Sequence, residues 1–341
     1  METLNAAIVG GGAIHLCHVG ALRQVPGVRL HALAEIDRDK GQALAYTYGC
    51  RFYPDYRALL WSDEIDVVHI CTPHHLHKTM VVEALAAGKH VFCEKPVGLN
   101  GREAAEIADA AARAPGRLAV CYQNRLNPTS RQIMCELSGG TLGKMLGMKA
   151  VLTWSRGGSY YTHSPWRGRY ATEGGSLLIN QAIHTLDLMQ WFAGGVARVK
   201  GVVDSGELAA VTEAEDSAMA TLHFHNGARG LFFATNSYTT DAPLLLEIHC
   251  EGGMLQLRDN QLWRVCAGGR THLISDPSPE SDAKAYWGSG HLAAIRQFYQ
   301  ALHHPSAPAE YTSIQEAKKS LAIVEAIYHA SQTRQWITLN T

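Results

Sequence analysis

The sequence predicts an α/β protein with a doubly wound parallel sheet, followed by a second domain built on an antiparallel sheet. Three observations predict this fold class. Short apolar runs alternate with helical patterns over the first ~120 residues. A glycine-rich turn follows the first of these runs, and after residue 122 the pattern changes to short strands joined by tight turns. Continuous apolar runs that end in Gly or Pro are typical of strands buried on both faces of a parallel sheet.

The composition fits a folded protein of about two domains. The chain has 341 residues, 46% of them hydrophobic, and Lys+Arg number 30 against Asp+Glu 31, for a net charge of -1. This balance argues against a nucleic-acid partner, which normally requires a basic excess. No apolar run approaches the roughly 20 residues that a membrane span needs, and the first residues lack a basic signal-peptide region. Because only 18% of residues are charged, part of the surface is expected to be covered in an oligomer.

The cysteines indicate a reducing compartment. There are eight of them, with no CxxC pair, and several lie inside strand-like runs, as Cys71 and Cys93 do. Such residues are typical of reduced, buried thiols, so a cytoplasmic protein is expected.

In the first domain, residues 1–122, turn residues mark the ends of the elements. Pro73 stops an apolar run, and Gly88 suits the C-cap of the helix that precedes it. The expected strands are residues 6–10, 28–35, 66–72, 90–94 and 118–122, and the expected helices run from the glycine turn to about residue 23 and over residues 38–48, 77–87 and 101–113.

The second domain, residues 123–341, has another rhythm. Asn226-Gly227 lies between two alternating runs, 218–225 and 228–234, and this pair predicts a hairpin with a type I′ turn. The other expected elements are a helix end and loop at 136–147, a strand at 148–154, a polar aromatic loop at 156–176, a helix at 177–192, short strands over 196–274, and helices at about 288–303 and 313–332.

The glycine turn has the form of a dinucleotide-binding loop. The run GGGAIH at residues 10–15 follows the first strand and opens a helix. Gly10 allows the tight turn, and Gly12 lets a pyrophosphate approach the backbone, where the N–H groups near Ala13 and Ile14 can hold it. His15 stands where the third glycine or alanine is expected, so this motif alone is weak.

Glu35 strengthens the dinucleotide reading. It ends the second strand, where an acidic residue hydrogen-bonds the ribose 2′-hydroxyl and repels a 2′-phosphate. The sequence therefore favours NAD over NADP. Arg38 could instead pair with a phosphate, and both residues could also be ordinary solvated surface charges.

Motifs further along resemble those of the Gfo/Idh/MocA oxidoreductases. The runs TPHHLH at 72–77 and AAGKHVFCEKP at 86–96 match the family patterns TPxxxH and AGKHVxxEKP. The resemblance continues through QNRLNP at 123–128, WRG at 166–168, EGGS at 173–176 and NQAIHTLD at 180–187. It spans nearly the whole chain. It implies an NAD(P)-binding Rossmann domain, then an α+β domain with an open, mainly antiparallel sheet that binds substrate and forms homodimers or homotetramers.

The resemblance also implies which residues contact the ligands. Further cofactor contacts are expected from Thr72, Pro73, His74, His77, Glu94, Lys95, Gln123 and Arg167. Substrate contacts are expected from Lys95, Asn124, Arg156, Tyr161, Trp166, Asn180 and His184. Aromatic faces pack on sugar rings and Arg holds hydroxyls or carboxylates, although the same residue types also dominate protein interfaces. For Tyr160, Tyr161 and Arg156 the sequence favours neither a substrate contact nor an oligomer contact over the other.

Lys95 is the candidate base. It ends a parallel strand at the carboxyl edge of the sheet, where such folds bind ligands, with Glu94 fixing its position. A cationic nicotinamide nearby lowers the pKa of a lysine, which makes the amine a workable base for a sugar hydroxyl. Otherwise Lys95 is an ordinary strand-end surface lysine.

In the family, the position of His184 supplies an acid/base or substrate-binding imidazole beside the catalytic lysine. Asn180 lies one helical turn earlier, where many relatives have Asp. Because an amide cannot take up a proton, proton removal is assigned to Lys95 or His184, and Asn180 is expected to bind a substrate hydroxyl. Asp187, three residues after His184, could orient its imidazole. The bland alternative for His184 is a hydrogen-bonded core histidine.

No metal site is expected, although the chain has 18 His. The densest clusters are His74-His75-x-His77 and the pair His223 and His225, and neither has acids or cysteines at ligand spacing.

Together these motifs predict an NAD-dependent sugar or cyclitol dehydrogenase, resembling most the relatives that oxidise glycosides or nucleotide sugars at C3. Redox-neutral glycoside cleavage with transient use of NAD, and cofactor binding without catalysis, stay open.

Overall fold

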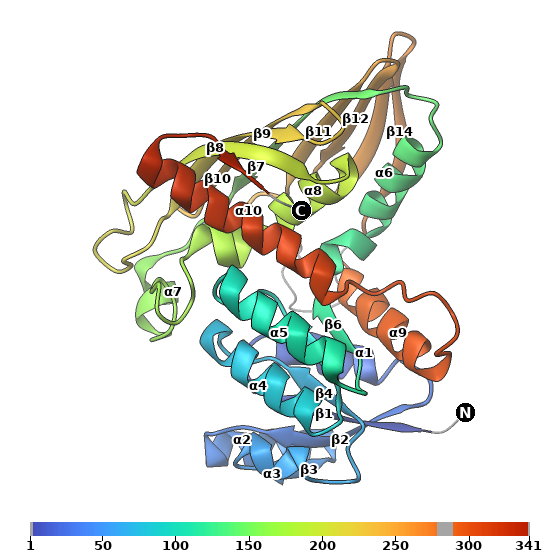
Figure 1. The fold of residues 1–341 in the computed structure, drawn as a ribbon, viewed down its shortest axis with the longest axis vertical. Coiled ribbons are helices and arrows are strands. Elements are labelled where there is room, and N and C mark those ends of the chain that lie inside the picture. The colour runs from blue at the N-terminus through green and yellow to red at the C-terminus, as the bar shows by residue number, and fades with distance from the viewer. Residues whose placement is uncertain (1–2, 278–288, 340–341) are drawn as a thin grey trace. The chain divides into compact units, whose positions relative to one another are not determined.

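A computed structural model describes residues 3–277 and 289–339, and the chain divides into two compact units (Figure 1). Unit 1 comprises Met1–Gln123 and His291–Lys318, and unit 2 comprises Asn124–Gly290 and Lys319–Thr341. The first boundary lies one residue from the predicted one. The two units differ from the predicted domains in one respect, because residues 291–318 group with unit 1 rather than with the rest of the chain after residue 123.

Unit 1 is built on a parallel sheet of six strands in the order β3-β2-β1-β4-β5-β6. Its strands are β1 Leu4–Val9, β2 Val28–Ala34, β3 Arg51–Tyr53, β4 Val67–Ile70, β5 His90–Glu94 and β6 Leu118–Cys121. The order reverses between β1 and β4, which places a ligand-binding crevice at the carboxyl ends of these two strands. The predicted doubly wound sheet is confirmed.

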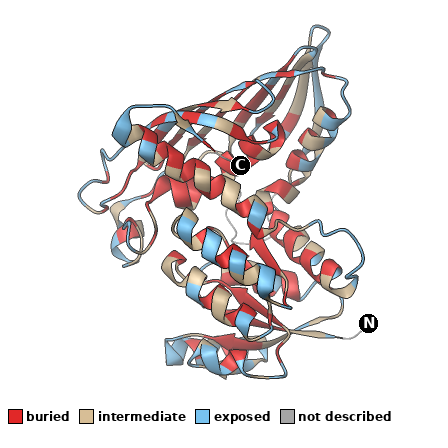
Figure 2. Cartoon of the chain, in the orientation of Figure 1, coloured by how far each residue is buried: buried red, intermediate tan, exposed pale blue. Residues whose placement is uncertain are grey.

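The helices of unit 1 begin and end where side chains or glycines satisfy the backbone. Asp37 accepts the N–H of Lys40 at the start of α2, and Gly49 ends that helix in the left-handed conformation. The helices before the second unit are α1 His15–Leu22, α2 Arg38–Tyr48, α3 Tyr56–Leu60, α4 His74–Ala86 and α5 Gly101–Arg113. In Figure 2, α5 carries both buried and exposed residues, as expected for a helix that covers one face of a sheet.

Three local features of unit 1 differ from the prediction. β3 and α3 were not predicted, because elements this short show no periodicity. α4 begins at His74 rather than three residues later, since Pro73 at its N-cap already starts the helix.

The segment 291–318 completes the core of unit 1. Phe298 and Tyr299 of α9 (Gly290–His303) are fully buried. The guanidinium of Arg117 donates to the carbonyls of Ala301 and Pro305. Residue 288, where the predicted helix begins, lies outside the described residues.

Unit 2 is built on an open sheet of nine strands in the order β14-β13-β12-β11-β7-β10-β9-β8-β15. Neighbouring strands are antiparallel except β7 and β10, which are parallel, so the predicted mainly antiparallel sheet is confirmed. The strands are β7 Met145–Thr153, β8 Val196–Asp204, β9 Ser217–Phe224, β10 Arg229–Thr235, β11 Leu245–Cys250, β12 Gly253–Arg258, β13 Gln261–Cys266, β14 Gly269–Ser275 and β15 Ile337–Thr338.

Helices cover one face of this sheet. α8 packs on β7, and α6 packs on β13 and β14. The helices are α6 Pro128–Ser138, α7 Gly158–Thr162, α8 Ile183–Ala193 and α10 Ile314–Thr333, whose first turn belongs to unit 1. A π-helical turn, Leu178–Ala182, leads directly into α8.

The predicted hairpin between β9 and β10 is confirmed, but its turn is not type I′. That turn requires positive φ at both central residues, and of the Asn226-Gly227 pair only Gly227 has it, at 87°. The loop is longer, and the Asn226 side chain accepts the N–H of Ala228. His225 lies in this loop and so does not share a strand face with His223. Two consecutive positive φ angles occur instead between β12 and β13.

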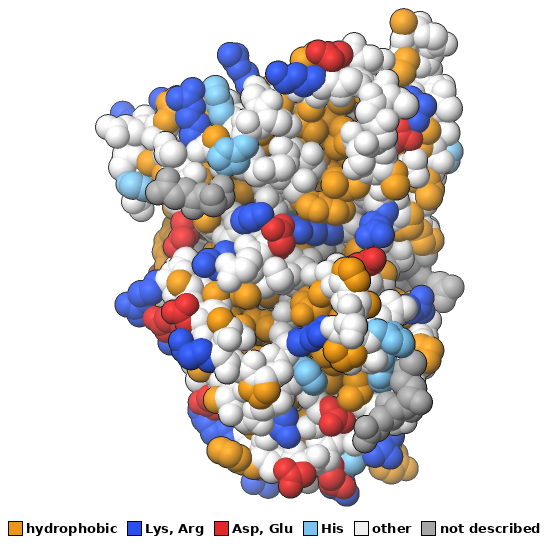
Figure 3. Space-filling view, turned by 45° about the vertical axis from the view of Figure 1, so that its right-hand side comes forward, with side chains coloured by type: hydrophobic (Ala, Val, Ile, Leu, Met, Phe, Trp, Pro, Cys, Tyr) orange, Lys and Arg blue, Asp and Glu red, His pale blue; other side chains and the backbone are white. Residues whose placement is uncertain are grey.

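The eight cysteines all lie within the described residues and form no disulfide there. None of the helices in the described ranges combines the length and apolar character needed to cross a bilayer. Figure 3 shows Lys and Arg mixed with Asp and Glu over the face in view, in keeping with the near-zero net charge.

Candidate functional site

The glycine loop of unit 1 has the backbone that a dinucleotide site needs. Gly10 has a φ of 98°, and a Cβ there would lie 2.8 Å from the carbonyl oxygen of Cys71, so only glycine fits. Gly12 is different, because a Cβ there would meet only that same oxygen at 3.9 Å. Protein packing therefore does not require glycine at residue 12, and close approach of a ligand supplies a reason for it.

Glu35 provides a fixed negative charge beside this loop. Its carboxylate accepts the N–H of Gly11 at 2.9 Å, the N–H of Asp37 at 3.2 Å and the ammonium of Lys40 at 3.1 Å. Burial favours the neutral acid, but the two backbone N–H groups and Lys40 outweigh it and lower the pKa of Glu35. Glu35 is therefore ionised at neutral pH.

Two neighbours of Glu35 are exposed. Arg38 lies at the exposed start of α2. Ile36 is 91% exposed, and sequence reasoning missed it. An apolar side chain with this exposure, beside an anion at the end of β2, offers a flat contact for an aromatic ring.

His15 has a structural role at the third position of the glycine motif. Its ring is buried and bonds the carbonyl of Gly12 through Nδ1 and the hydroxyl of Tyr48 through Nε2, at 2.5 and 2.8 Å. The imidazole thus ties the loop to α2 and replaces the close helix–strand packing that a small residue would allow.

His77 ties together the carboxyl ends of β4 and β5. It is fully buried, with Nδ1 2.6 Å from the carbonyl oxygen of Pro96 and Nε2 2.8 Å from that of Thr72. Burial lowers its pKa. Pro73 and His74 follow on the same loop and start α4. Thr72, Pro73, His74 and His77 therefore lie on one short segment, and the buried ring of His77 fixes that segment through its two hydrogen bonds.

Lys95 lies on the neighbouring loop, directly after β5. Among residues 91–98, all of which the structure describes, it is the single residue that is not buried. Its backbone N–H lies 3.3 Å from Oε2 of Glu94, and the Lys95–Pro96 peptide is cis. Lys95 is thus a half-buried residue directly after a buried strand end of unit 1.

A buried chain of hydrogen bonds holds Glu94. His18 Nε2 lies 3.0 Å from Glu94 Oε1, and the Nδ1 atoms of His18 and His69 are 2.9 Å apart. His69 Nε2 lies 2.9 Å from the hydroxyl of Tyr299. Burial lowers the pKa of both histidines, so the rings are neutral.

Neutral rings allow one consistent direction for this chain. Tyr299 donates to His69, His69 donates to His18, and His18 donates to Glu94. Burial opposes the charge of Glu94, but hydrogen bonds from His18 and His291 lower its pKa well below the ordinary value. Sequence reasoning missed this network, whose members lie far apart in the chain.

One buried group in the described residues has the spacing of a metal site. Ligand atoms of Glu94, Cys121 and His291 all lie within 4.8 Å of one another. Burial raises the pKa of the Cys121 thiol well above its ordinary value, which opposes the thiolate that a metal needs. The expectation of no metal site stays a prediction. The Cys121 thiol also lies 3.7 Å from Oε1 of Gln123, which is buried, whereas Asn124 on the same short turn is half-buried.

In unit 2, Asn180 and His184 reach the surface together. Within residues 175–190, Asn180 and His184 are half-buried, and all the remaining residues are buried. The two lie about one helical turn apart. Asn180 lies in the π-helical turn Leu178–Ala182, a distortion that is frequent at functional sites. Both residues are therefore accessible on this segment, and their joint contact with a substrate stays a prediction.

Glu173 is a partner of Asn180 that sequence reasoning missed. Its Oε1 accepts the Asn180 amide Nδ2 at 2.5 Å, and its Oε2 accepts the N–H of Gly168 at 2.5 Å. Burial raises the pKa of Glu173 to about 7. The EGGS motif contains this residue, but a motif alone does not show where its carboxylate points.

An aromatic and cationic group lies next to Asn180. The guanidinium of Arg167 lies 4.0 Å from the ring centre of Tyr160 and 5.2 Å from that of Trp166. The Tyr160 hydroxyl accepts the amide of Gln181 at 3.0 Å and lies 3.4 Å from the amide nitrogen of Asn180. This group could present both a sugar-packing face and hydrogen-bond donors.

Comparison with known proteins decides the family. A model of the oxidoreductase family with an NAD-binding Rossmann fold matches residues 4–122, and a model of the GFO/IDH/MocA C-terminal domain matches residues 130–256. These matches together cover well over half of the chain. The chain belongs to the Gfo/Idh/MocA oxidoreductases. It is thus an NAD-binding oxidoreductase, and the glycine loop and Glu35 lie in its Rossmann domain.

Individual relatives agree with this placement. The uncharacterized oxidoreductase YrbE of Bacillus subtilis is 30% identical over 67% of this chain and 65% of its own length, so slightly less than two thirds of that relative is matched. Levoglucosan dehydrogenase of Pseudarthrobacter phenanthrenivorans is 26% identical over 75% of this chain and 73% of its own.

Solved structures show the same fold over the whole chain. WlbA dehydrogenase from Bordetella pertussis, in complex with NADH and UDP-GlcNAcA, has a TM-score of 0.86 at 26% identity and covers 100% of both chains. Levoglucosan dehydrogenase in complex with NADH has a TM-score of 0.90 over 100% of both chains, and its 22% identity shows the shared fold alone.

Two of the predicted substrate residues brace unit 2 instead of lining its surface. The Tyr161 hydroxyl lies 3.0 Å from that of Ser176 and accepts the amide of Asn236 at 3.1 Å. Arg156 is buried and pairs with Asp241 at 2.7 Å. Of the two adjacent tyrosines, Tyr160 is therefore the one directed toward Asn180.

Asp187, the last residue of the NQAIHTLD run, does not serve as the predicted partner of His184. Its two carboxylate oxygens accept Nε and Nη2 of Arg125, both at 2.7 Å, and Oδ1 also accepts the hydroxyl of Ser320 at 2.6 Å. Asp187 is almost fully buried. The motif aspartate is thus the acidic half of a buried ion pair.

Proposed function

We propose that this protein is an NAD-dependent dehydrogenase that oxidises a ring hydroxyl of a sugar, a glycoside, a nucleotide sugar or a cyclitol. One observation carries the proposal: Lys95 leaves a buried strand end at the carboxyl edge of an NAD-binding Rossmann sheet. The names of levoglucosan dehydrogenase and of the WlbA complex with UDP-GlcNAcA support a carbohydrate substrate.

The proposed chemistry divides one oxidation between a base and a cofactor. Held by the glycine loop and Glu35, NAD would supply the acceptor for the hydride of the carbon that bears the hydroxyl. Lys95 takes the hydroxyl proton, and His184 assists as its acid/base partner. Asn180 binds a substrate hydroxyl and takes up no proton. The products are a keto-sugar, NADH and one proton on the enzyme.

Residues of unit 1 fit the proposed cofactor. The backbone at Gly12, Ala13 and Ile14 would hold the pyrophosphate at the start of α1. Ionised Glu35 would accept from the ribose hydroxyls, and exposed Ile36 would contact the adenine ring. Thr72, Pro73 and His74 at the end of β4, together with Lys95 and Gln123, complete the cofactor residues proposed in unit 1, while His77 and Glu94 support them from the interior. Arg167, the one cofactor residue proposed outside unit 1, belongs to unit 2.

The assay that tests this proposal mixes the protein with NAD or NADP and a panel of monosaccharides, glucosides, inositols and UDP-sugars, and follows reduced-nicotinamide absorbance. Turnover with one stereochemical class supports the dehydrogenase. NADH binding without any reduction across the panel contradicts it. In that case, release of sugar from glucosides without net NADH would identify redox-neutral cleavage instead.

Replacing Glu35 with serine is expected to shift the cofactor preference from NAD toward NADP. Removing the carboxylate removes its repulsion of a 2′-phosphate and its bonds to the ribose hydroxyls. We expect the Kd for NADPH to fall about tenfold and the Kd for NADH to rise about tenfold, each about 1.4 kcal/mol. Titration of nicotinamide fluorescence measures both constants. Asp39→Ser, which removes an exposed acid from the first turn of α2, is the control and leaves both values unchanged. Equal shifts in the two variants would exclude a local role for Glu35.

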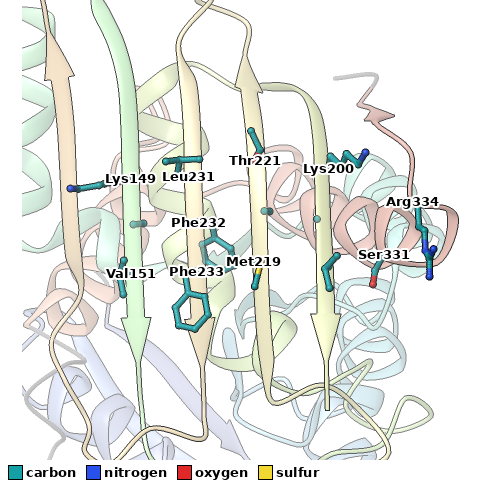
Figure 4. A pocket seen from close by; sticks show the side chains of 14 residues that line it. Lys149, Val151, Lys200, Met219, Thr221, Leu231, Phe232, Phe233, Ser331 and Arg334 are labelled. Atoms are coloured by element: carbon teal, nitrogen blue, oxygen red, sulfur yellow. The ribbon is translucent and has the colours of Figure 1, made fainter. Parts of the chain in front are cut away.

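The outer face of the unit 2 sheet supports the predicted homodimer or homotetramer. Val202, Met219 and Leu231, on three adjacent strands, are 51%, 55% and 58% exposed. Figure 4 shows Val151, Phe233 and Met219 side by side on neighbouring strands, and Leu231 level with Lys149 and Thr221. All of these residues line one pocket. An apolar patch of this kind on a rigid sheet is typical of an interface. We therefore propose self-association through this face.

Leu231→Asp is expected to reduce the mass of the particle, because a carboxylate would be buried in the proposed interface without a partner. Sedimentation or light scattering measures the mass at fixed protein concentration. Tyr46→Asp is the control, since Tyr46 is 92% exposed on α2. An unchanged mass in Leu231→Asp, with the wild type oligomeric, would place the interface elsewhere.

The proposed partners and compartment follow from the same observations. The thiols are free within the described residues, which suits a reducing cytoplasm. The partner proposed is a small-molecule carbohydrate, with neither nucleic acid nor membrane, in keeping with the near-zero net charge.

A further inference from the structure

The contact between Glu173 and Asn180 constrains which end of the Asn180 amide faces the carboxylate. Oε1 of Glu173 lies 2.5 Å from Nδ2 of Asn180, which is itself one of the two half-buried residues of this segment. An ionised carboxylate only accepts hydrogen bonds, whereas an amide has a donor end and an acceptor end. The amide of Asn180 must therefore turn its nitrogen toward Glu173.

The carboxylate itself is fixed. Its second oxygen accepts the backbone N–H of Gly168, so it cannot rotate away from Asn180 without breaking that bond. The Tyr160 hydroxyl is a second acceptor near the same amide nitrogen, at 3.4 Å. The amide nitrogen thus faces two acceptors, the anchored carboxylate and the hydroxyl, and this gives the amide a single favoured orientation.

We propose that Glu173 is a positioning residue that fixes which end of the Asn180 amide meets the substrate, so that this position selects a sugar hydroxyl that donates its proton. The inference rests on the proposed function, in which Asn180 binds a substrate hydroxyl. With the nitrogen held by Glu173, the acceptor oxygen is the end turned away from the carboxylate. A bound hydroxyl then meets an acceptor at Asn180, and its oxygen is left to accept from other donors.

Protonation of Glu173 removes this selection. A neutral carboxyl can donate as well as accept, so it no longer excludes the reversed amide. Burial raises the pKa of Glu173 to about 7, with Arg167 lowering it and Glu215 raising it further. Tyr160 and Tyr161 also face this carboxylate, and burial raises the pKa of each hydroxyl, so both are neutral here. Substrate binding should therefore weaken as the pH falls through about 7.

Glu173→Gln tests the inference with little change of shape. The glutamine amide has a single acceptor oxygen, and the N–H of Gly168 needs it. The glutamine NH2 group then faces Asn180 and favours the reversed amide, in which the Asn180 oxygen points to residue 173. We expect KM to rise about tenfold above about pH 8 and kcat to change less. We also expect KM of the variant to lose the dependence on pH near 7 that the wild type shows.

Glu215→Gln is the matched control. Glu215 is also a buried carboxylate of unit 2 with a raised pKa, about 6, but it accepts from Leu178 and Tyr328 rather than from Asn180. This variant changes stability and keeps the dependence of KM on pH, with the midpoint moved to lower pH, because the charge of Glu215 no longer raises the pKa of Glu173. The same KM profile in both glutamine variants would overturn the inference, because the effect would then come from the loss of any buried charge.

A double-mutant cycle separates positioning from general structure. If Glu173 acts through Asn180, Glu173→Gln changes KM by no more than about twofold in an Asn180→Ala background. An equal, independent rise of KM in both backgrounds contradicts the inference.

The same four proteins also give a readout without substrate. Urea unfolding should show coupling between positions 173 and 180 at about pH 8.5 that disappears at about pH 5.5. Absence of coupling at the higher pH overturns the inference even for an active enzyme. Coupling in a protein that binds NADH but turns over no sugar leaves the amide orientation supported while the proposed function fails, so the two failures are distinguishable.

Discussion

Lys95→Met should lower kcat by about 10²–10⁴-fold, because removing a positioned base typically costs this much. Methionine keeps a similar length, and the backbone N–H of residue 95 still reaches Glu94. The strand end and the glycine loop therefore stay in place, and the Kd for NADH should remain within about threefold of the wild type. Steady-state turnover and NADH titration on the same preparation measure both quantities.

Two further variants sharpen this test. Lys95→Arg keeps a positive charge that stays protonated at any working pH, so it should lose as much turnover as methionine if residue 95 accepts a proton. Lys78→Met removes a lysine that pairs with Glu106 on the surface of the same unit, and it should leave kcat unchanged. A Lys95→Met variant that retains more than about a tenth of wild-type kcat would exclude Lys95 as the base.

Much of the fold could be predicted because local patterns agree with the final contacts. α2, β5 and α5 have the predicted bounds, since apolar runs and helical patterns there end at glycine or at capping residues. β3 and α3 are too short to carry a period. The return of residues 291–318 to unit 1 was not predictable, because it depends on which apolar surface α9 covers, and an amphipathic helix does not specify its partner.

The candidate site was predictable at the level of strand ends and helix faces. The strand pattern places Lys95 at a carboxyl end of the sheet, and helical spacing puts Asn180 one turn before His184. The roles assigned to these residues came from the family resemblance and stay predictions. Tyr160, rather than the predicted Tyr161, lies next to Asn180. This depends on α7, a helix of five residues inside what the sequence predicts as a loop. Glu173 was missed because its role depends on a tertiary contact that no periodicity reports.

Asp187→Asn is expected to lower the free energy of unfolding by about 3–5 kcal/mol, because it leaves a buried guanidinium without its counter-charge. Arg125 and Asp187 form a two-point contact in which both side chains are buried. The guanidinium also lies over the ring of Trp191, at 5.4 Å from its centre. Denaturant unfolding of the variant and the wild type measures the difference.

A double variant tests whether this loss of stability comes from an unpaired charge rather than from the absence of an aspartate as such. Replacing both residues, Arg125→Met with Asp187→Leu, removes both charges and should recover most of the stability lost in Asp187→Asn. If Asp187 instead acted on His184, Asp187→Asn would move the pH profile of kcat/KM with little loss of stability, and the double variant would not restore that profile. The two outcomes separate a structural ion pair from an acid/base partner, which the shared helix face of Asp187 and His184 leaves open in the sequence.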